Sequence, residues 1–320
     1  MNRIRAAVVG AGQFGRNHMR VIHGSPRAEL VAVVDIDPER AAEAAAPYGC
    51  RALTDLAALN GSVDAAIVAT PTSAHVDVAL ALMNAGIDVL VEKPIARDLT
   101  SARCLAEAAE SGRRVLQVGH LERFNPAVSV LSANVRLPLF FEVHRLSQFT
   151  PRSLDIDVVL DLMIHDIDIV LSMVGRMPEE IRAAGISILT PKVDIANVRL
   201  SFPGGCVANL TASRVSTERV RKLRLFQPSE YLSIDYGRQE AFSLSVTPDR
   251  RIAPRTLTVQ KNEPLQLELE HFFESVETRR PPRVGGRDAV RALEVALGIL
   301  GKIEEHSRVV AQSLASAQKG

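Results

Sequence analysis

Short apolar runs and helix-like segments alternate along the first 120 residues. The runs are rich in β-branched residues and apolar throughout, which is typical of strands buried on both faces of a parallel sheet. They lie at residues 4–9, 30–34, 65–69, 89–91 and 115–118. The segments between them carry helix signals and lie at residues 14–23, 39–48, 74–85 and 101–111. Repeated βα units of this kind predict an α/β fold with a doubly wound parallel sheet of the Rossmann type.

After about residue 126 the apolar positions become longer, alternating runs. Several show period-two alternation, which favours an antiparallel sheet with one covered face. These runs lie at residues 139–149, 180–189, 194–202, 206–215, 221–226 and 230–236. Pro203-Gly204-Gly205 predicts a hairpin turn between two of them. Helices are expected at 265–278 and 287–306, followed by a frayed tail at 313–320.

The change of pattern predicts two domains. Residues 1–123 would form the Rossmann domain, and residues 124–320 a C-terminal α+β domain with a large, mostly antiparallel open sheet. The helix at 287–306 could pack back on the Rossmann domain.

Composition and charge exclude several classes of protein. The chain has 320 residues with a net charge of +1, and basic and acidic residues are mixed throughout, so a nucleic-acid interface is not expected. Apolar runs long enough for a membrane span are absent from the sequence, and the N-terminal run leads into a glycine turn instead of a signal-peptide cleavage site. The three cysteines, Cys50, Cys104 and Cys206, are scattered. Disulfides and cysteine-based zinc sites are therefore not expected, and a cytoplasmic location is favoured.

The first predicted strand runs into a glycine-rich turn. Gly10-Ala11-Gly12-Gln13-Phe14-Gly15 matches G-x-G-x-x-G between a strand and a helix, which is the context required for dinucleotide binding. Gly10 would permit the tight turn, Gly12 the approach of a pyrophosphate, and Gly15 the close packing of helix and strand. The alternative is that these glycines are only turn residues.

Asp35 ends the second predicted strand. A carboxylate at this place accepts hydrogen bonds from the adenine ribose hydroxyls and repels a 2′-phosphate, so NAD is favoured over NADP. Asp37 is the weaker candidate for the same role. The alternative role of Asp35 is to cap the following helix.

Glu92-Lys93-Pro94 follows the fourth predicted strand, at the edge where a doubly wound sheet binds its ligand. Unlike an arginine, a lysine there can exchange a proton, so Lys93 could act on a carbonyl oxygen. The Lys93–Pro94 bond is a candidate cis peptide. The alternative is a surface lysine after a strand.

Polar residues interrupt the apolar segment 158–174 at regular spacing. With about 100° per residue, Asp157, Asp161, His165 and Asp168 share one narrow stripe of a helix, while Asp166 lies opposite. Asp161 and His165, at i and i+4, could form an oriented acid–base pair. Alternatives are a metal site, which lacks a second His or Cys at ligand spacing, and a set of satisfied helix polar groups.

The glycine fingerprint, Glu92-Lys93-Pro94 and Asp161-x-x-x-His165 together resemble the glucose–fructose oxidoreductase / inositol dehydrogenase (Gfo/Idh/MocA) family. Further matches are His18, the stretch from Thr70 to His75, and the stretch at 119–126. The resemblance implies that Lys93 hydrogen-bonds the reacting oxygen, that His165 accepts the proton, and that Asp161 binds substrate or orients His165. It also implies cofactor contacts and an oligomer, a homodimer or homotetramer, formed through the C-terminal sheet. The implied cofactor residues are Gly10, Gly12, Gln13, Phe14, Gly15, Asp35, Thr70, Pro71, Thr72, His75 and Glu92.

The chain departs from many family members where glycines precede the catalytic aspartate. It has Asp155-Ile156-Asp157-Val158-Val159-Leu160 there and Gly-His-Leu-Glu-Arg-Phe-Asn-Pro at 119–126, and both resemble the nucleotide-sugar branch. That branch oxidises the 3-hydroxyl of UDP-N-acetylglucosamine to a 3-keto sugar, which can feed lipid A.

A UDP-sugar would need cationic partners for its diphosphate. The candidates for substrate binding are Arg123, Asn125, Arg152 and Arg214. The basic run at 219–224 is a further source, because as a strand it would show its charges mostly on one face, and the alternative is a solvated strand face. The alternatives are a dehydrogenase of a free sugar or inositol-type polyol, and a non-catalytic NAD(H)-binding regulatory protein.

Overall fold

The computed structural model describes residues 3–149 and 156–317, and the chain divides into two compact units. The first unit comprises residues 1–124 and 263–290, and the second comprises residues 125–262 and 291–320. The sequence analysis assigned residues 263–290 to the C-terminal domain, whereas their contacts place them in the first unit. Among the described helices, none is long and apolar enough to cross a membrane.

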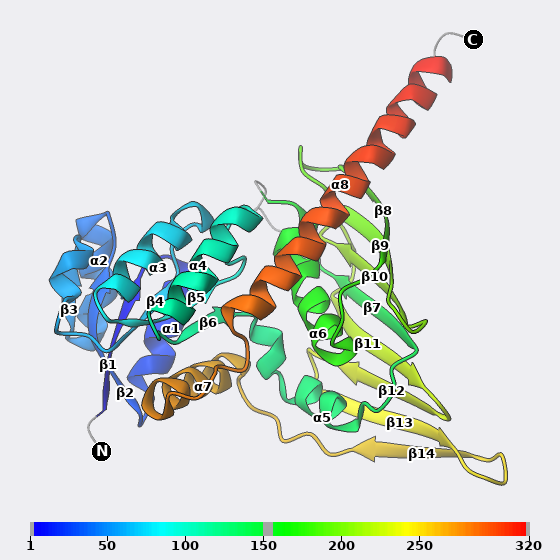
Figure 1. Ribbon diagram of the computed structural model, residues 1–320, viewed down its shortest axis with the longest axis horizontal. Coiled ribbons are helices and arrows are strands. Elements are labelled where there is room, and N and C mark those ends of the chain that lie inside the picture. The colour runs from blue at the N-terminus through cyan, green and yellow to red at the C-terminus, as the bar shows by residue number, and fades with distance from the viewer. Residues whose placement is uncertain (1–2, 150–155, 318–320) are drawn as a thin grey trace. The chain divides into compact units, whose positions relative to one another are not determined.

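The first unit is built on a six-stranded sheet in which all neighbouring strands are parallel, in the order β3-β2-β1-β4-β5-β6 (Figure 1). The strands are β1 (Ile4–Val9), β2 (Ala28–Val34), β3 (Arg51–Leu53), β4 (Ala65–Val68), β5 (Asp88–Glu92) and β6 (Leu116–Gly119). The helices between them are α1 (Gln13–His23), α2 (Pro38–Ala45), α3 (His75–Asn84) and α4 (Leu99–Ser111). This confirms the predicted doubly wound fold. Sequence analysis missed β3, which is short and largely exposed.

Helix α7 (Pro264–Thr278) belongs to the first unit because of its apolar side chains. Leu269, Phe272 and Phe273 are fully buried in one cluster with Val8 of β1 and Leu90 of β5. Removing a side chain of this size from water contributes about 1.5–3 kcal/mol. The α7 helix therefore covers the same sheet face as α1, although residues 125–262 of the second unit separate it from the rest of the first unit in the chain.

The second unit contains an eight-stranded sheet in the order β14-β13-β12-β11-β7-β10-β9-β8 (Figure 1). Its strands are β7 (Phe140–Leu146), β8 (Glu180–Ile186), β9 (Ile195–Ser201), β10 (Val207–Ser213), β11 (Val220–Gln227), β12 (Glu230–Asp235), β13 (Glu240–Val246) and β14 (Ile252–Leu257). Only the pair β7 and β10 is parallel among the described strand pairs of this sheet, so the prediction of a mostly antiparallel sheet is confirmed. The Pro203-Gly204-Gly205 hairpin is also present, with positive φ at both glycines.

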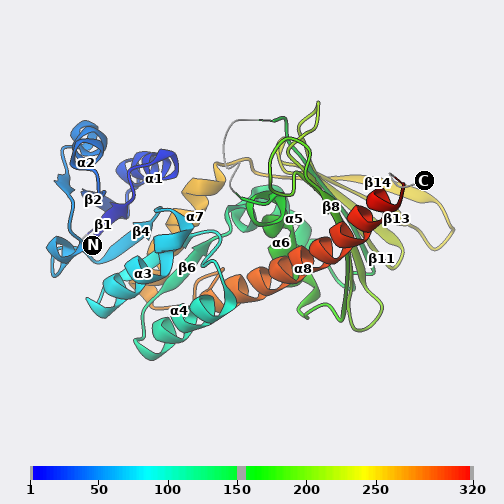
Figure 2. The ribbon, with the colours of Figure 1, turned by 90° about the horizontal axis from the view of Figure 1, so that it is seen from above.

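One face of this sheet is covered by α5 (Pro126–Asn134), α6 (Ile164–Val174) and α8 (Gly286–Ala317) (Figure 2). The other face carries a row of aromatic rings whose centroids are 4.9–5.9 Å apart. The row consists of Phe140, Phe226, Tyr231 and Phe242 on four neighbouring strands.

Sequence analysis missed β13, β14 and α5 and ended the last helix too early. The α8 helix continues to Ala317, into the segment expected to fray. Its first residues belong to the first unit, where a Cβ on Gly286 would lie 2.9 Å from the side chains of Ala106 and Leu116.

Candidate active site

The glycine turn after β1 has the geometry that a dinucleotide requires. Gly10 has a φ of +99°, and a Cβ there would lie 2.6 Å from the carbonyl oxygen of Ala69. A Cβ on Gly15 would overlap the carbonyl oxygen of Gly10, so only glycine allows α1 to pack this closely on the turn. Around Gly12, in contrast, no described atom outside the adjoining residues of the chain lies within 4 Å of the Cβ position. Gly12 also caps the N-terminus of α1, where free N–H groups favour a phosphate.

Asp35 supports this turn from the end of β2. Its Oδ2 accepts the N–H of Ala11 at 2.8 Å and its Oδ1 accepts the N–H of Asp37 at 3.0 Å. The carboxylate that caps α2 is Asp37, which accepts the N–H groups of Glu39 and Arg40. The alternative reading of Asp35 as the helix cap is therefore wrong. Asp35 is 7 % exposed and lies at the sheet edge where a ribose would bind.

Three further side chains lie at this edge: Phe14, which the sequence analysis expected among the cofactor residues, and Ile36 and Arg40, which it missed. Ile36 is 93 % exposed, and Phe14 at the start of α1 is 62 % exposed, so each offers apolar surface beside the glycine turn. Arg40 lies with Nη1 3.5 Å from Asp35 Oδ1 and Nη2 3.1 Å from Asp37 Oδ2. The sequence signal that could have identified Ile36 is its position as an apolar residue directly after Asp35, the acid that ends the strand.

His75 joins the loops that follow β4 and β5. Its Nε2 lies 2.9 Å from the carbonyl oxygen of Thr70, and its Nδ1 lies 2.9 Å from that of Pro94. Burial lowers the pKa of His75 despite these two carbonyls. Thr70 Oγ1 is buried without a hydrogen-bond partner among the described residues, as expected of a hydroxyl that serves a bound group. Pro71 is exposed, and Thr72 begins a 3₁₀ turn (Thr72–Ala74).

Lys93 directly follows β5, and the Lys93–Pro94 peptide is cis, as the sequence predicts. The neighbouring Glu92 accepts a hydrogen bond within 2.7 Å from Nε2 of the buried His18. Burial acts to raise the pKa of Glu92, but the His18 hydrogen bond and the charges of His18 and Lys93 lower it below the usual range. Glu92 therefore places a negative charge one residue before Lys93.

A second buried carboxyl, Glu268 of α7, was not anticipated from the sequence. Glu268 is fully buried, and neither of its carboxyl oxygens has a hydrogen-bond partner among the described residues. Its backbone carbonyl accepts the Gln117 side-chain amide at 3.0 Å. Burial, together with the charge of Glu92, raises the pKa of Glu268 well above its usual range. Burial and the charges of Arg123 and Lys93 lower the pKa of His120, in the same unit, to about 3.

We expect Glu268→Gln to change how stability depends on pH. A carboxyl whose pKa is raised in the folded state keeps its proton while the unfolded chain loses it above about pH 4.3. Stability then falls as pH rises above that value, by up to about 1.4 kcal/mol per pH unit, and recovers as pH falls. Glu268→Gln removes this slope, so its stability relative to the natural protein should increase from pH 5 to 8.

Urea unfolding at several pH values measures this difference. Glu270→Gln is the matched control, because Glu270 is partly exposed on the same helix and accepts a hydrogen bond from Gln266. Parallel pH profiles for the natural protein and Glu268→Gln would reject the protonated carboxyl.

In the second unit, the predicted polar stripe passes through a π-helical turn. Residues Val159–Met163 form this turn, and the α-helix starts only at Ile164. The prediction of one continuous α-helix from 158 is therefore wrong, and the 100° spacing does not apply between Asp161 and His165. The sequence of this turn, which is apolar except for Asp161, does not distinguish a π-turn from an α-helical turn. Asp161 and His165 are both partly exposed, whereas Asp168 is 2 % exposed.

Asp157, at the start of this stripe, has a structural role. Its Oδ1 accepts the N–H of Val193 at 2.9 Å, and its carbonyl accepts the N–H of Asp161 at 3.0 Å. Among the described residues, no cluster of three or more His, Cys, Asp or Glu side chains is arranged to hold a metal ion.

The predicted substrate residues are already engaged in the fold to different degrees. Asn125 caps α5, accepting the Ala127 N–H and donating to the carbonyl of Tyr236 at 3.1 Å. Arg123 donates to the carbonyl of Arg283 at 3.4 Å. Arg152 lies outside the described residues.

Arg214 is 6 % exposed and holds the segment before the π-turn. It donates to the carbonyl of Ile156, and its Nε lies 3.9 Å from Asp194 Oδ1. Asp194 in turn accepts three backbone N–H groups and the Thr190 hydroxyl, and these hydrogen bonds overcome burial to lower its pKa to about 2.

The basic run at 219–224 does not present its charges on one face. Arg221 points to the inner face with the buried Leu223, whereas Lys222 and Arg224 point to the outer face. Arg224 is paired there with Glu142 at 3.0 Å. The expectation of one charged face is wrong because two adjacent residues, 221 and 222, both carry charge.

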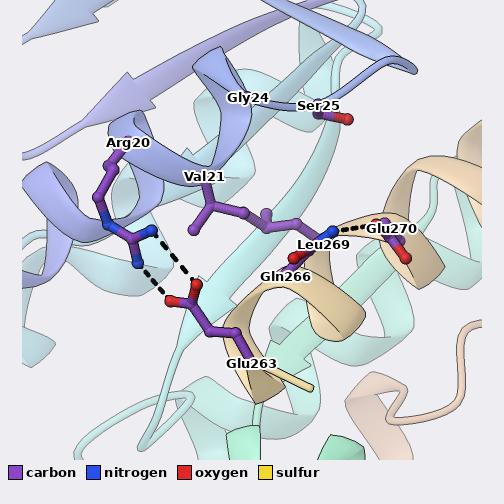
Figure 3. Close-up of a pocket in the computed structure, with 8 residues that line it drawn as sticks. All are labelled: Arg20, Val21, Gly24, Ser25, Glu263, Gln266, Leu269 and Glu270. Atoms are coloured by element: carbon purple, nitrogen blue, oxygen red, sulfur yellow. Dashed lines mark hydrogen bonds and ion pairs between the residues drawn. The ribbon is translucent and has the colours of Figure 1, made fainter. Parts of the chain in front are cut away.

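A small cavity between α1 and α7 is not this site. Its volume is about 120 Å³, below the roughly 300–1,000 Å³ usual for a small-molecule site. An ion pair between Arg20 and Glu263 lies along one side, and Gln266 and Glu270 are hydrogen-bonded nearby (Figure 3).

Comparisons with known proteins agree with the two-unit architecture. Residues 4–120 match the model of an oxidoreductase family with an NAD-binding Rossmann fold, and residues 129–226 match the GFO/IDH/MocA C-terminal domain. The chain is 37 % identical to a UDP-N-acetylglucosamine 3-dehydrogenase of Acidithiobacillus ferrooxidans, over 95 % of this chain and 98 % of that protein. A solved structure of that enzyme superimposes with a TM-score of 0.90, over 95 % of this chain and 99 % of the other. An inositol 2-dehydrogenase of Rhizobium meliloti is 24 % identical over 96 % of this chain and 98 % of its own length.

Proposed function

The chain belongs to the Gfo/Idh/MocA family of oxidoreductases, and from this premise we propose that it oxidises a secondary alcohol of a nucleotide sugar with NAD. The specific substrate we propose is UDP-N-acetylglucosamine, oxidised at its 3-hydroxyl to the 3-keto sugar. The observation that carries this proposal is the 37 % identity to a UDP-N-acetylglucosamine 3-dehydrogenase over 95 % of the chain. A 3-keto sugar of this kind suits a later transamination, and we assign the product to lipid A precursor supply.

The residues of the first unit fit a dinucleotide. Open space at Gly12, the carboxylate of Asp35 and the buried, unpartnered hydroxyl of Thr70 all lie at the carboxyl ends of strands or in the loops that follow them. When bound, NAD⁺ supplies the hydride acceptor. We assign the pyrophosphate to the Gly12 turn and the adenine ribose to Asp35, with Phe14 and Ile36 as apolar contacts.

The choice between NAD and NADP depends on two neighbouring charges. Asp35 opposes a 2′-phosphate, whereas Arg40, 3.5 Å away, attracts it. Because Asp35 is buried and held by two backbone N–H groups, we expect its charge to dominate and NAD to be preferred. Asp35→Ala should weaken NAD binding about tenfold and lower the preference for NAD over NADP.

Calorimetric titration of both cofactors measures this preference. Asp55→Ala is the control, because Asp55 caps a short 3₁₀ helix (Leu56–Leu59) elsewhere in the first unit. An unchanged NAD/NADP ratio in Asp35→Ala would remove Asp35 from the ribose site.

In the reaction that we propose, Lys93 donates a hydrogen bond to the reacting oxygen, and His165 takes the proton of the hydroxyl. Asp161 orients His165 or binds the sugar. General base catalysis by such a group contributes roughly 10²–10⁴-fold. Arg123, Asn125, Arg152 and Arg214 stay candidates for substrate binding, and among the basic run only Arg221 points to the inner face.

We further propose that two or four copies associate through the outer face of the eight-stranded sheet. The aromatic row there includes Phe226 and Phe242, each 38 % exposed, and exposed rings of this kind are typical of an interface. Light scattering of the purified protein measures the oligomeric state.

The three cysteines are free thiols, which supports a reducing, cytoplasmic location.

The test of the main proposal is a reduction assay. Purified protein with NAD⁺ is offered UDP-N-acetylglucosamine, free N-acetylglucosamine, glucose or myo-inositol, and NADH absorbance is followed. A parallel series contains a 2-oxo acid to reoxidise any cofactor that stays bound. Turnover of the UDP-sugar alone is expected. Turnover of myo-inositol instead would favour the polyol reading, and NAD binding without turnover of any substrate would favour the non-catalytic reading.

A further inference from the structure

A buried ion pair attaches the helix of His165 to the sheet of the second unit. Arg145 on β7 donates from Nε to Asp166 Oδ2 at 2.7 Å and from Nη2 to Asp166 Oδ1 at 2.9 Å. Both side chains are only 2 % exposed. Because Asp166 directly follows His165 in α6, the contact holds the helix one residue from the proposed base.

The guanidinium of Arg145 also contacts an aromatic ring, in addition to its two hydrogen bonds with Asp166. Its central carbon lies 5.1 Å from the ring centroid of Tyr236, a cation–π contact with a ring that is 2 % exposed. On the neighbouring strand β11, Arg221 lies directly across from Arg145, and on β10 the neighbour is Ala212. Both hydrogen bonds and the ring contact therefore fix the plane of the guanidinium.

Stability alone does not explain a charged pair at this position. Removing two ions from water costs several kcal/mol, and apolar residues of similar volume are often as stabilising. The surroundings would accept such residues, because Ile167, Ile169 and Val170 of α6 are all fully buried. The ion pair also fixes the orientation of α6 relative to β7, because two parallel hydrogen bonds define an orientation that an apolar contact does not.

The orientation of α6 about its own axis needs such a contact because a π-turn directly precedes the helix. In that turn the Ile164 N–H donates to the carbonyl of Val159, one residue further back than in an α-helix. Converting the wider turn into a regular α-helical turn would rotate the following helix by about 100° relative to the residues before it. Such a rotation would carry His165 off its present face. The Asp166 contact lies three residues after the turn and opposes it.

We propose that Arg145 and Asp166 are positioning residues that set the orientation of His165. This inference rests on the proposed function, in which His165 takes the proton of the substrate hydroxyl. Arg145 and Asp166 do not touch the substrate in this proposal. They act through the rotation of α6.

The decisive variant is the double substitution Arg145→Met/Asp166→Leu, which removes both charges together and leaves the local net charge unchanged. We expect it to fold with a Tm within a few degrees of the natural protein or above it. We expect kcat to fall at least tenfold, with the Kd for NAD unchanged because the dinucleotide residues are in the other unit. Arg279→Gln/Asp88→Asn is the matched control, since it removes an Arg–Asp pair of the first unit.

The single variant Asp166→Asn separates charge from orientation. It leaves the charge of Arg145 without this carboxylate, so the pKa of His165 should fall and the acidic limb of the pH–rate profile should move to lower pH. Asp161 and Asp168 on the same helix are unchanged. The double variant should move this limb less, although its kcat falls as much or more.

A readout without turnover keeps this test apart from the substrate assay. In protein with ¹³C-labelled histidine, the His165 signal is identified by its loss in His165→Gln. We expect this signal to shift in Arg145→Met/Asp166→Leu and in Asp166→Asn, and to stay unchanged in the control Arg279→Gln/Asp88→Asn. A moved signal without turnover of any sugar by the natural protein would support the positioning and reject the proposed function.

Two results would overturn the inference. One is a double variant with natural kcat and an unmoved His165 signal. The other is a double variant that does not fold while Asp166→Asn folds with natural kcat, which would make the pair a stabilising contact only.

Discussion

His165→Ala should lower kcat with UDP-N-acetylglucosamine by roughly 10²–10⁴-fold, the usual contribution of a general base. The physical reason is that the hydroxyl proton must leave with the hydride, and no alanine can accept it. The Kd for NAD should change by less than about twofold, because the residues that we assign to the dinucleotide are in the first unit and His165 is in the second. Single-turnover kinetics and cofactor titration measure the two effects separately.

Lys93→Ala should also lower kcat strongly, because the reacting oxygen loses its hydrogen-bond donor. Lys93→Arg restores the charge but not an exchangeable proton, so we expect it to recover little activity. His23→Ala is the control for histidine removal, since His23 is exposed at the end of α1. Near-normal turnover in His165→Ala or in Lys93→Ala would show that the catalytic assignment is wrong.

Gly15→Ala and Gly12→Ala should separate the two roles of the glycine turn. A Cβ at Gly15 overlaps the carbonyl of Gly10, and overpacking of this kind costs about 1–3 kcal/mol or more. That exceeds the roughly 1 kcal/mol that alanine gains over glycine within a helix. Gly15→Ala should therefore lower the Tm of the protein without cofactor by several degrees, and the displaced turn should also weaken NAD binding.

Gly12→Ala should behave differently, because no described atom outside the adjoining residues of the chain lies within 4 Å of its Cβ position and its φ is −69°. We expect the Tm without cofactor to stay within about 2 °C, while the Kd for NAD rises at least tenfold because the methyl group occupies the place of the pyrophosphate. Calorimetry with and without NAD measures both quantities. Natural NAD affinity in Gly12→Ala would show that the pyrophosphate does not bind at this turn.

Several features of the site were predictable because they depend on neighbours in the chain. The strand-turn-helix order around Gly10, Gly12 and Gly15 is local, and so is the cis bond before Pro94. Inward-facing charge also left a signal. Arg145 occupies a buried position in the period-two pattern of β7, and Glu268 lies within the apolar stripe of α7. Neither signal shows which charge lies nearby, because Asp166, the ion-pair partner of Arg145, is 21 residues away in the sequence, and Glu92, whose charge raises the pKa of Glu268, is 176 residues away.

Roles that depend on distant partners were misjudged or stayed open. Asp35 looked like a possible helix cap until the structure placed Asp37 there and Asp35 against the N–H of Ala11. Arg214 looked available for a substrate, but it is nearly buried against Ile156 and Asp194. Composition and spacing cannot show that a side chain is already engaged.

The sequence by itself determined the two-domain plan, the dinucleotide turn and the positions of Lys93, Asp161 and His165 along the chain. These follow from periodicity and glycine placement, which act over a few residues. Only the tertiary structure decided that α7 completes the first unit, that a π-turn precedes His165, and that Arg145 grips Asp166. Those outcomes depend on which residues far apart in the chain pack against one another away from water. The local hydrophobic pattern does not specify those pairings.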